Sequence, residues 1–213
     1  MNITELLNTI VSNKIAEMHI AMPAKIVSYD FATRRASVQP AVDRKYNDDE
    51  ILVFPIIHSV PVLQPSSGGA SVNFPVKVGD SVLLTFSERS LEQWLQDGKQ
   101  SAPDDARQNN LTDAIAHIGL KPFSEISSAE NNDDLSIVFA GSKIILKPNG
   151  VIKAEASNIN ISGNINITGK LTAQNLEAIS QIKGATALID DKDFATHTHI
   201  GVTVGSGITG VVA

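Results

Sequence analysis

A six-residue repeat in the second half of this 213-residue chain limits its possible folds more than any other feature. Residues 157–173 read SNINISGNINITGKLTA, in which an apolar, a polar and a second apolar residue precede a turn that contains glycine. Alternation with a period of two is typical of a β-strand and not of a helix. The same alternation occurs earlier, in SKIILKPNGVIKAEA at 142–156. The second part of the chain is therefore predicted to consist of short strands.

Strands of this kind cannot enclose a core by themselves. Between Gly141 and Ala213 the chain has one aromatic residue, Phe194. Each strand offers a single apolar row, and its edges carry unpaired backbone groups. Either the chain coils on itself as a β-solenoid, or several chains wind together. A solenoid needs many successive repeats, and only two complete units and a partial third occur, so we favour an intertwined oligomer.

Two histidines follow the repeat. His197 and His199 stand two residues apart in DFATHTHIG and project from the same side of an extended strand. Two imidazoles make a poor metal site, but three chains around a common axis would bring six. Six nitrogens in two layers suit an octahedral transition-metal ion and exceed the four ligands of a usual zinc site. Because isolated His-x-His pairs occur often by chance, this prediction depends on the oligomer and on the glycine-rich tail GVTVGSGITG that follows.

The first part of the chain has a different pattern. Residues 3–18 carry apolar side chains at helical spacing and predict an amphipathic helix. Short apolar runs, punctuated by glycine and proline, predict about five strands between residues 22 and 87. Five short strands suit a small Greek-key barrel such as an OB-fold. Within it, Val78-Gly79-Asp80 is predicted to turn into a strand whose alternate side chains face the interior.

After the predicted barrel, SLEQWLQDG at 90–98 predicts a short helix or turn. His117 lies in an apolar run and is expected to be packed and not to be a ligand. SEISSAENNDD at 124–134 has the composition of a linker. We therefore expect a mainly β protein with four segments: an N-terminal helix at 1–20, an OB-fold-like domain with a helical and loop extension at 21–133, a β-helical shaft at 134–194 and a metal-binding apex at 195–213.

The charge of the chain, −6 in total, is unevenly distributed. Residues 1–133 carry 17 acidic and 11 basic side chains, whereas residues 134–213 carry 6 of each. An acidic first part argues against binding to nucleic acid, which needs a basic face. The second part has few charges for its length, which is typical of a surface that another molecule covers.

Composition excludes further classes of protein. No apolar run approaches the roughly 18–20 residues of a membrane-spanning helix. The first residues lack the basic start and compact apolar block of a signal peptide, so we expect no classical export route. The chain has no cysteine, which excludes disulfide bonds, thiolate metal ligands and a thiol nucleophile.

Together these motifs resemble the baseplate central spike, or membrane-piercing, proteins of contractile phage tails and tailocins. The resemblance rests on THTHIGVTVGSGITG, on the NINISGNINITG repeat, and on SLEQWLQDG with LTDAIAHIGL. It implies a homotrimer with an N-terminal OB-fold, an intertwined triple-stranded β-helix, and an apex where His197 and His199 of three chains bind one iron ion. It also implies baseplate hub or tail-tube proteins as partners, the bacterial outer membrane as target, and a place at the tail baseplate tip after assembly in the host cytoplasm.

Such a function is mechanical, so we expect no catalytic residue. A hexapeptide-repeat acyltransferase is an alternative, but it needs a longer run of repeats. A receptor-binding tail fibre is another, although it usually ends in a recognition domain larger than the fourteen residues after His199. A muramidase would need paired carboxylates; Asp104 with Asp105, and Asp190 with Asp191, lie in polar loops and are expected to be solvated. The acidic balance disfavours an oligonucleotide-binding barrel.

Overall fold

A computed structural model describes residues 2–45, 49–125, 129, 131–180, 183–184, 188–189 and 192–193. The chain divides into two units, 1–155 and 156–213, and each is described by itself. The predicted apex at 195–213 lies outside the described residues. Within the part of the chain that the structure describes, no helix is long and apolar enough to cross a membrane.

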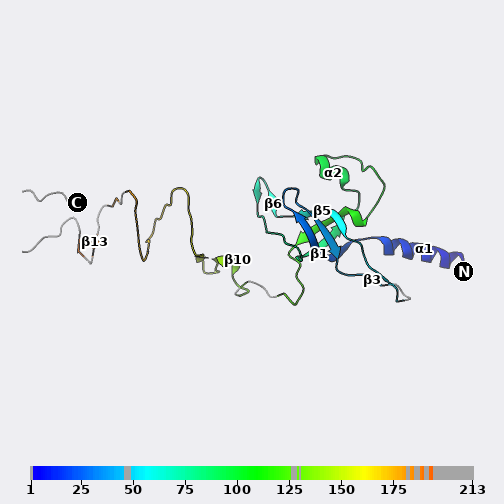
Figure 1. Cartoon of the computed structure of the whole chain (residues 1–213), viewed down its shortest axis with the longest axis horizontal. Helices are drawn as coiled ribbons and strands as arrows, with labels where there is room; N and C mark the ends of the chain where they lie inside the picture. The colour runs from blue at the N-terminus through cyan, green and yellow to red at the C-terminus, as the bar shows by residue number, and fades with distance from the viewer. Residues whose placement is uncertain are drawn as a thin grey trace, which may run out of the picture. The chain divides into compact units, whose positions relative to one another are not determined.

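The first unit is built on a closed barrel (Figure 1). Around the barrel its five strands are β1 (Ala21–Asp30), β2 (Arg35–Pro40), β5 (Ile57–Leu63), β9 (Ala114–Ile118) and β8 (Ser81–Phe86). Strand β1 pairs with both β2 and β8 and so closes the sheet. All neighbours are antiparallel except β5 and β9, which are parallel. A closed five-stranded barrel of this kind confirms the prediction of an OB-like barrel in the first part of the chain.

The prediction that all barrel strands lie between residues 22 and 87 was wrong. The fifth barrel strand, β9, follows residue 87 and was not among the strands expected between 22 and 87. Residues 51–62, which read as one apolar run, divide into a two-residue strand, β4 (Ile51–Leu52), and most of β5. Two small hairpins stand beside the barrel sheet: β3 (Arg44–Lys45) with β4 (Ile51–Leu52), and β6 (Ser66–Ser67) with β7 (Ala70–Ser71). The parallel pairing of β5 and β9 joins segments about fifty residues apart, which local patterns do not reveal.

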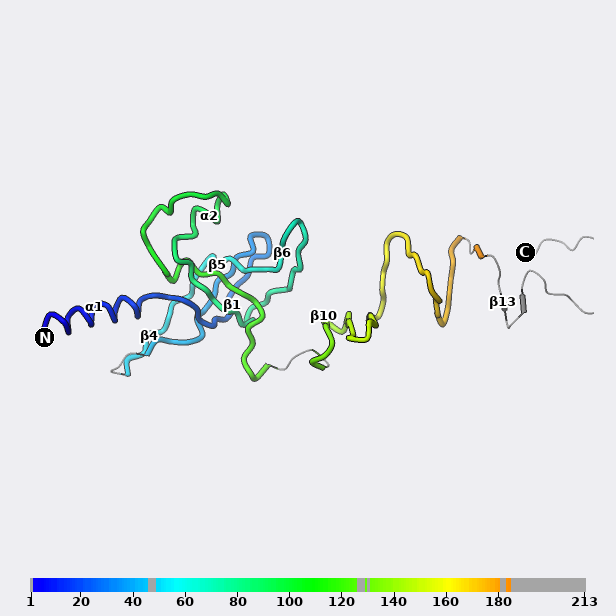
Figure 2. Tube along the Cα trace, turned by 180° about the vertical axis from the view of Figure 1, so that it is seen from behind, coloured from blue at the N-terminus to red at the C-terminus, as the bar shows by residue number. Residues whose placement is uncertain are grey.

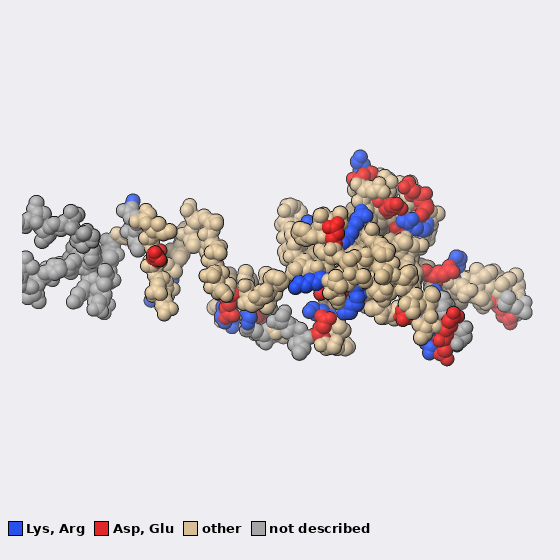
Figure 3. Space-filling view, viewed as in Figure 1, with Lys and Arg blue, Asp and Glu red and all other residues tan. Residues whose placement is uncertain are grey.

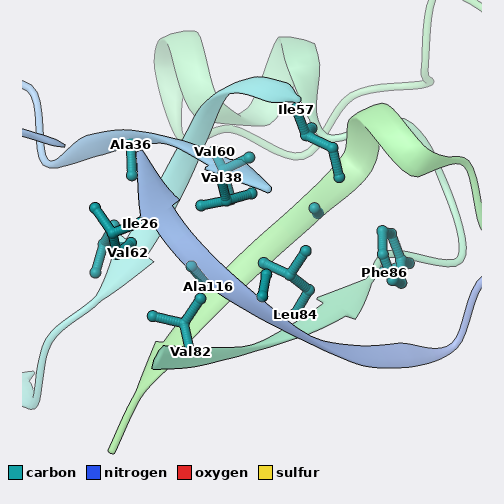
Figure 4. Packing of buried hydrophobic residues seen from close by; sticks show 12 residues of the cluster. Ile26, Ala36, Val38, Ile57, Val60, Val62, Val82, Leu84, Phe86 and Ala116 are labelled. Atoms are coloured by element: carbon teal, nitrogen blue, oxygen red, sulfur yellow. The ribbon is translucent and has the colours of Figure 1, made fainter. Parts of the chain in front are cut away.

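Alternate side chains of the barrel strands form one apolar core (Figure 4). In β2 and β8 every second residue is buried, as a period of two requires when one face points inward. The residues with less than 2% of their surface exposed and the largest side chains are Ile26, Leu84, Val38, Val60 and Val82. Burial of these side chains within one chain is the main driving force for the barrel.

The predicted turn before β8 is confirmed. Gly79 adopts φ +92°, a conformation that favours glycine, and its N–H donates to the carbonyl of Ile26 over 2.8 Å. The N–H of Lys77 donates to a carboxylate oxygen of Asp80 over 2.8 Å. The turn thereby joins the start of β8 to the middle of β1.

Two helices and a 3₁₀ turn accompany the barrel: α1 (Ile3–Glu17), α2 (Glu92–Asp97) and η1 (Leu111–Asp113). They confirm the two predicted helical segments. At the start of α1, the side chain of Asn2 accepts a hydrogen bond from the N–H of Glu5, and the side chain of Glu5 accepts one from the N–H of Asn2. This capping box satisfies two donors that a helix start leaves open. No residue of α1 is buried.

The chain from residue 134 onward contains a sheet and then a stretch without helix or strand. The sheet is an antiparallel meander of β10 (Leu135–Phe139), β11 (Ser142–Leu146) and β12 (Ile152–Glu155). From 156 to 180 the structure assigns no strand, and every residue is exposed. A short hairpin of β13 (Leu188–Ile189) and β14 (Lys192–Asp193) follows. The intertwined β-helix expected within 134–194 needs further chains and stays a prediction.

Candidate functional sites

The predicted metal ligands, His197 and His199, lie outside the described residues, so the metal site stays a prediction. Among the residues that the structure does describe, no group of three or more histidine, aspartate or glutamate side chains is arranged to hold a metal ion. The other three histidines of the chain all lie in the first unit.

Two of these histidines make hydrogen bonds on the outer surface of the barrel. In β9, Nε2 of His117 lies 2.8 Å from the hydroxyl of Thr85 on the neighbouring strand β8. In β5, Nδ1 of His58 lies 3.0 Å from the hydroxyl of Ser37 on β2. His117 is half-buried. It is thus held by a hydrogen bond on the outer side of the barrel and is not part of the buried core.

The third, His19, lies between α1 and β1 and packs against aromatic rings. Its ring meets Phe54 edge-on at a centroid distance of 5.7 Å and lies tilted against Phe86 at 5.3 Å. Burial, and then the positive charge of Arg44, lowers the pKa of His19. Both effects favour the neutral imidazole, which suits a ring packed among apolar groups.

The most buried charged side chain that the structure describes in the barrel domain is Asp113, at the end of η1, with 3% of its surface exposed. Arg107 donates to both of its carboxylate oxygens, from Nε over 2.7 Å and from Nη2 over 3.1 Å. The backbone N–H of Leu91 donates to the same carboxylate over 3.0 Å. The carbonyl of Asp113 accepts from the N–H of Ser87. Asp113 thus ties both ends of the long segment between β8 and β9 to the barrel. Figure 2 shows this segment, which carries α2, looping out from the barrel.

The electrostatics of this pair favour the charged forms. Burial alone would raise the pKa of Asp113, but the hydrogen bonds from Arg107 and Leu91, with the charge of Arg107, outweigh it and lower the pKa. The hydrogen bond to Asp113, opposed by burial, raises the pKa of Arg107. A carboxylate held in this way keeps its charge near neutral pH and is a poor general acid. Its role is to position the α2 segment.

A hollow of about 340 Å³ lies between this pair, the outer face of β2 and β5, and the α2 segment. Acidic and basic side chains lie together over α2 (Figure 3). The two carboxylates that line the hollow, Glu92 and Asp113, both pair with Arg107. Asp113 is buried in this contact, whereas Glu92 is 65% exposed and lies 3.6 Å from Nη2 of Arg107. Arg35 also lines the hollow, and its side chain makes no hydrogen bond or ion pair with another residue of the described ranges.

The carboxylate pairs considered for a muramidase do not form a site in the described part of the chain. Asp105 accepts a hydrogen bond from Nη1 of Arg107 over 2.6 Å, and Asp104 is exposed in the loop beside it. Asp190 and Asp191 lie outside the described residues. Sequence reasoning missed the pairing of Arg107 with Asp113, because two charged residues six apart in a polar loop carry no periodic signal.

Exposed apolar side chains in the chain after residue 134 are another candidate site. From residue 135 to residue 179, large apolar side chains are exposed on the sheet and along the repeat. In the repeat, Ile159, Ile161 and Ile165 each expose 60–62% of their surface. Large apolar side chains exposed in this way, on the sheet and separately along the repeat, are typical of a surface that another molecule covers.

The barrel connects the chain to known proteins. Residues 22–119 match the model of a family described as the phage protein Gp138 N-terminal domain. The match spans the five barrel strands and ends before the sheet that begins at Leu135. It supports a phage-related protein with a structural function, and so a component of the virion. No curated protein matches the sequence.

Proposed function

We propose that this chain is the central spike of a contractile phage tail or tailocin baseplate, which pierces the bacterial outer membrane when the sheath contracts. Three copies assemble. The barrels face baseplate hub or tail-tube proteins, and the segments from 134 to 194 form an intertwined shaft. At the apex, His197 and His199 of the three chains hold one iron ion.

The observation that carries this proposal is the apolar surface of the repeat. Every residue from 156 to 180 is exposed in the single chain, including a regular series of isoleucines. Such a segment cannot order itself, because it buries too little surface to offset the loss of conformational entropy. Winding with two identical segments supplies both apolar contacts and partners for the strand edges. That the segment follows a barrel matched by a phage domain model supports a place in the virion.

The mechanism is mechanical and changes no bond in a substrate. A piercing tip must be narrow and must resist unfolding under load. Interwound strands spread the load over many backbone hydrogen bonds. A metal ion at the apex joins three chain ends that would otherwise fray, and its binding to the folded trimer adds stability by mass action. We propose no enzymatic activity.

The first test is the mass of the purified protein. Light scattering should give about three times the 22.7 kDa of one chain. A monomer at micromolar concentration would contradict the proposal.

The second test is metal content. Elemental analysis should find about one transition-metal ion, iron, per trimer. The double variant His197→Ala/His199→Ala should lose this metal, whereas His58→Ala, which removes an exposed histidine of the barrel, should keep it. If the double variant retains its full metal content, the assignment of the apex is wrong.

A further inference from the structure

The sheet of β10, β11 and β12 has two chemically different faces. Directly opposed residues of neighbouring strands project from the same face. On one face Leu135, Leu146 and Ile152 lie opposite one another across the three strands. In the next row of that face are Ile137, Ile144 and Ala154, and the last row holds Phe139 with Ser142. No member of this face is charged.

The other face is polar for most of its area. Val138, Lys143 and Glu155 form one row, and Ser136, Ile145 and Lys153 form the next. The Lys143 ammonium lies 3.8 Å from the carboxylate of Glu155, which also pairs with Lys153. These charged side chains are paired with one another, and Ile145 between them is buried, with 3% of its surface exposed, so this face is covered more than the apolar one within the single chain.

The apolar face is uncovered in the single chain. Its six large side chains expose between 39% and 70% of their surface, with Leu146 at the lower limit and Ile152 at the upper. Among the strands that the structure describes, β10 and β12 each pair only with β11, so both edges of the sheet are open in the described part of the chain. A partner must therefore satisfy both an apolar face and two rows of unpaired backbone groups.

We propose that the apolar face of this sheet packs against the same face of two other copies of the chain, so that three sheets enclose one apolar core. The face consists of Leu135, Ile137, Phe139, Ile144, Leu146, Ile152 and Ala154. This inference rests on the trimer proposed above. It adds an interface separate from the six-residue repeat and from the histidines.

Copies of the same chain fit the face better than an unrelated protein. Because the face carries no charge, three like faces meet without electrostatic repulsion. In a closed ring of three, the β10 edge of one copy comes beside the β12 edge of the next, so no edge is left open. A globular partner could cover the face but would leave both edges exposed. The apolar alternation also continues into the repeat at 157–173, whose side chains are equally uncovered.

Such an interface would set the register of the shaft. A slip of one residue in a strand exchanges its two faces. In β10 it would replace Ile137 by Val138 in the core, and in β11 it would bring Lys143 into the core. Burying a charge without a partner is strongly unfavourable. The sheet would therefore align the three chains before the repeat, where the alternating pattern is the same in successive units and specifies register weakly.

The chain has no cysteine, so a single introduced thiol reports the accessibility of its own position. We would compare Ile137→Cys with Val138→Cys, adjacent residues of β10 on opposite faces, by their rates of alkylation in the native protein. In the single chain Ile137 is 61% exposed and Val138 is half-buried, so an uncovered face makes position 137 the faster. The proposed interface reverses this order, with position 137 slower by about tenfold or more.

Both rates are measured on protein whose mass has been determined, and again in denaturant, where they should be equal. A trimer in which position 137 reacts faster overturns the sheet interface and leaves the spike proposal standing. The same result is expected if an unrelated partner covers the face, because that partner is absent from the purified protein. If Ile137→Cys loses the mass of a trimer while Val138→Cys keeps it, the contact is supported. A monomeric unmodified protein overturns the spike proposal itself, and this inference with it.

Discussion

The barrel and the segment from 135 to 180 use the same alternation of apolar and polar residues with opposite results. In the barrel, alternate side chains such as Val82 and Leu84 are fully buried within one chain. In the second region, side chains with the same spacing, such as Ile159 and Ile161, remain about 60% exposed. The pattern of a strand therefore predicts which face will be buried. Whether one chain suffices to bury it depends on whether the sheet can close.

Closure depends on strand length and on the segments between strands. Strand β1 has ten residues and pairs with two neighbours, and the long segment between β8 and β9 lets β9 reach β5. Each unit of the six-residue repeat has room for only three alternating residues before the next turn. Segments this short gain stability by stacking on others of the same kind.

The largest effect is expected from the repeat, if it forms a trimer. Ile161→Ala should destabilise each chain by about 2 kcal/mol and the trimer by roughly three times as much, because the side chain is buried once in every chain. Unfolding monitored at several protein concentrations should show a large, concentration-dependent loss. The neighbouring Asn160→Ala, on the other face of the strand, serves as control. Equal and small effects of both changes would show that the isoleucine side chains of the repeat stay exposed.

A somewhat smaller effect, confined to one chain, is expected in the barrel. Leu84→Ala removes a side chain with 0% exposure and should lower the free energy of unfolding by about 3 kcal/mol. Because the core lies within one chain, the loss should not depend on protein concentration. Leu83→Ala, on the outer side of β8, should cost clearly less. A concentration-dependent effect of Leu84→Ala would mean that the barrel core also relies on other chains.

The smallest effect concerns the ion pair that holds the α2 segment. Arg107→Met leaves the carboxylate of Asp113 buried without its ionic partner, and should lower the free energy of unfolding by about 2 kcal/mol at neutral pH. This loss is smaller than for a fully buried ion pair, because 27% of the Arg107 side chain is exposed. The matched control is Arg89→Met, whose partner Glu88 is exposed, and which should change stability by less than about 0.5 kcal/mol.

The pH dependence of this ion pair follows from the direction of the pKa shift. In the unmodified protein the pKa of Asp113 is lower in the folded state than in the unfolded chain. The pair therefore stabilises the fold above the unfolded pKa, and this contribution is lost as the pH falls through the folded pKa. The difference between Arg107→Met and the unmodified protein should shrink in acid, as urea titrations at neutral and acidic pH would show. A difference that does not change with pH would argue against an ionic contribution.

Local patterns predicted much of the fold correctly. The helix at 3–17, the turn at Gly79 and the helix around Trp94 each follow from a few adjacent residues, and all three are present. Strand β9 was missed as a barrel member, and Arg107 with Asp113 was missed as an ion pair. Both depend on contacts between segments that are distant in the chain or lie in a loop without periodicity.

The sequence by itself determined where strands alternate, where the chain turns, and that the second region has too few large side chains for a core of its own. These properties depend on each residue and its near neighbours, because side-chain direction and backbone preference are local. Only the tertiary structure decided that β5 lies parallel to β9, that Asp113 holds the α2 segment, and that all the apolar rows of one small sheet share one uncovered face. Strand partners and register are decided by closure and burial, which involve the whole chain at once.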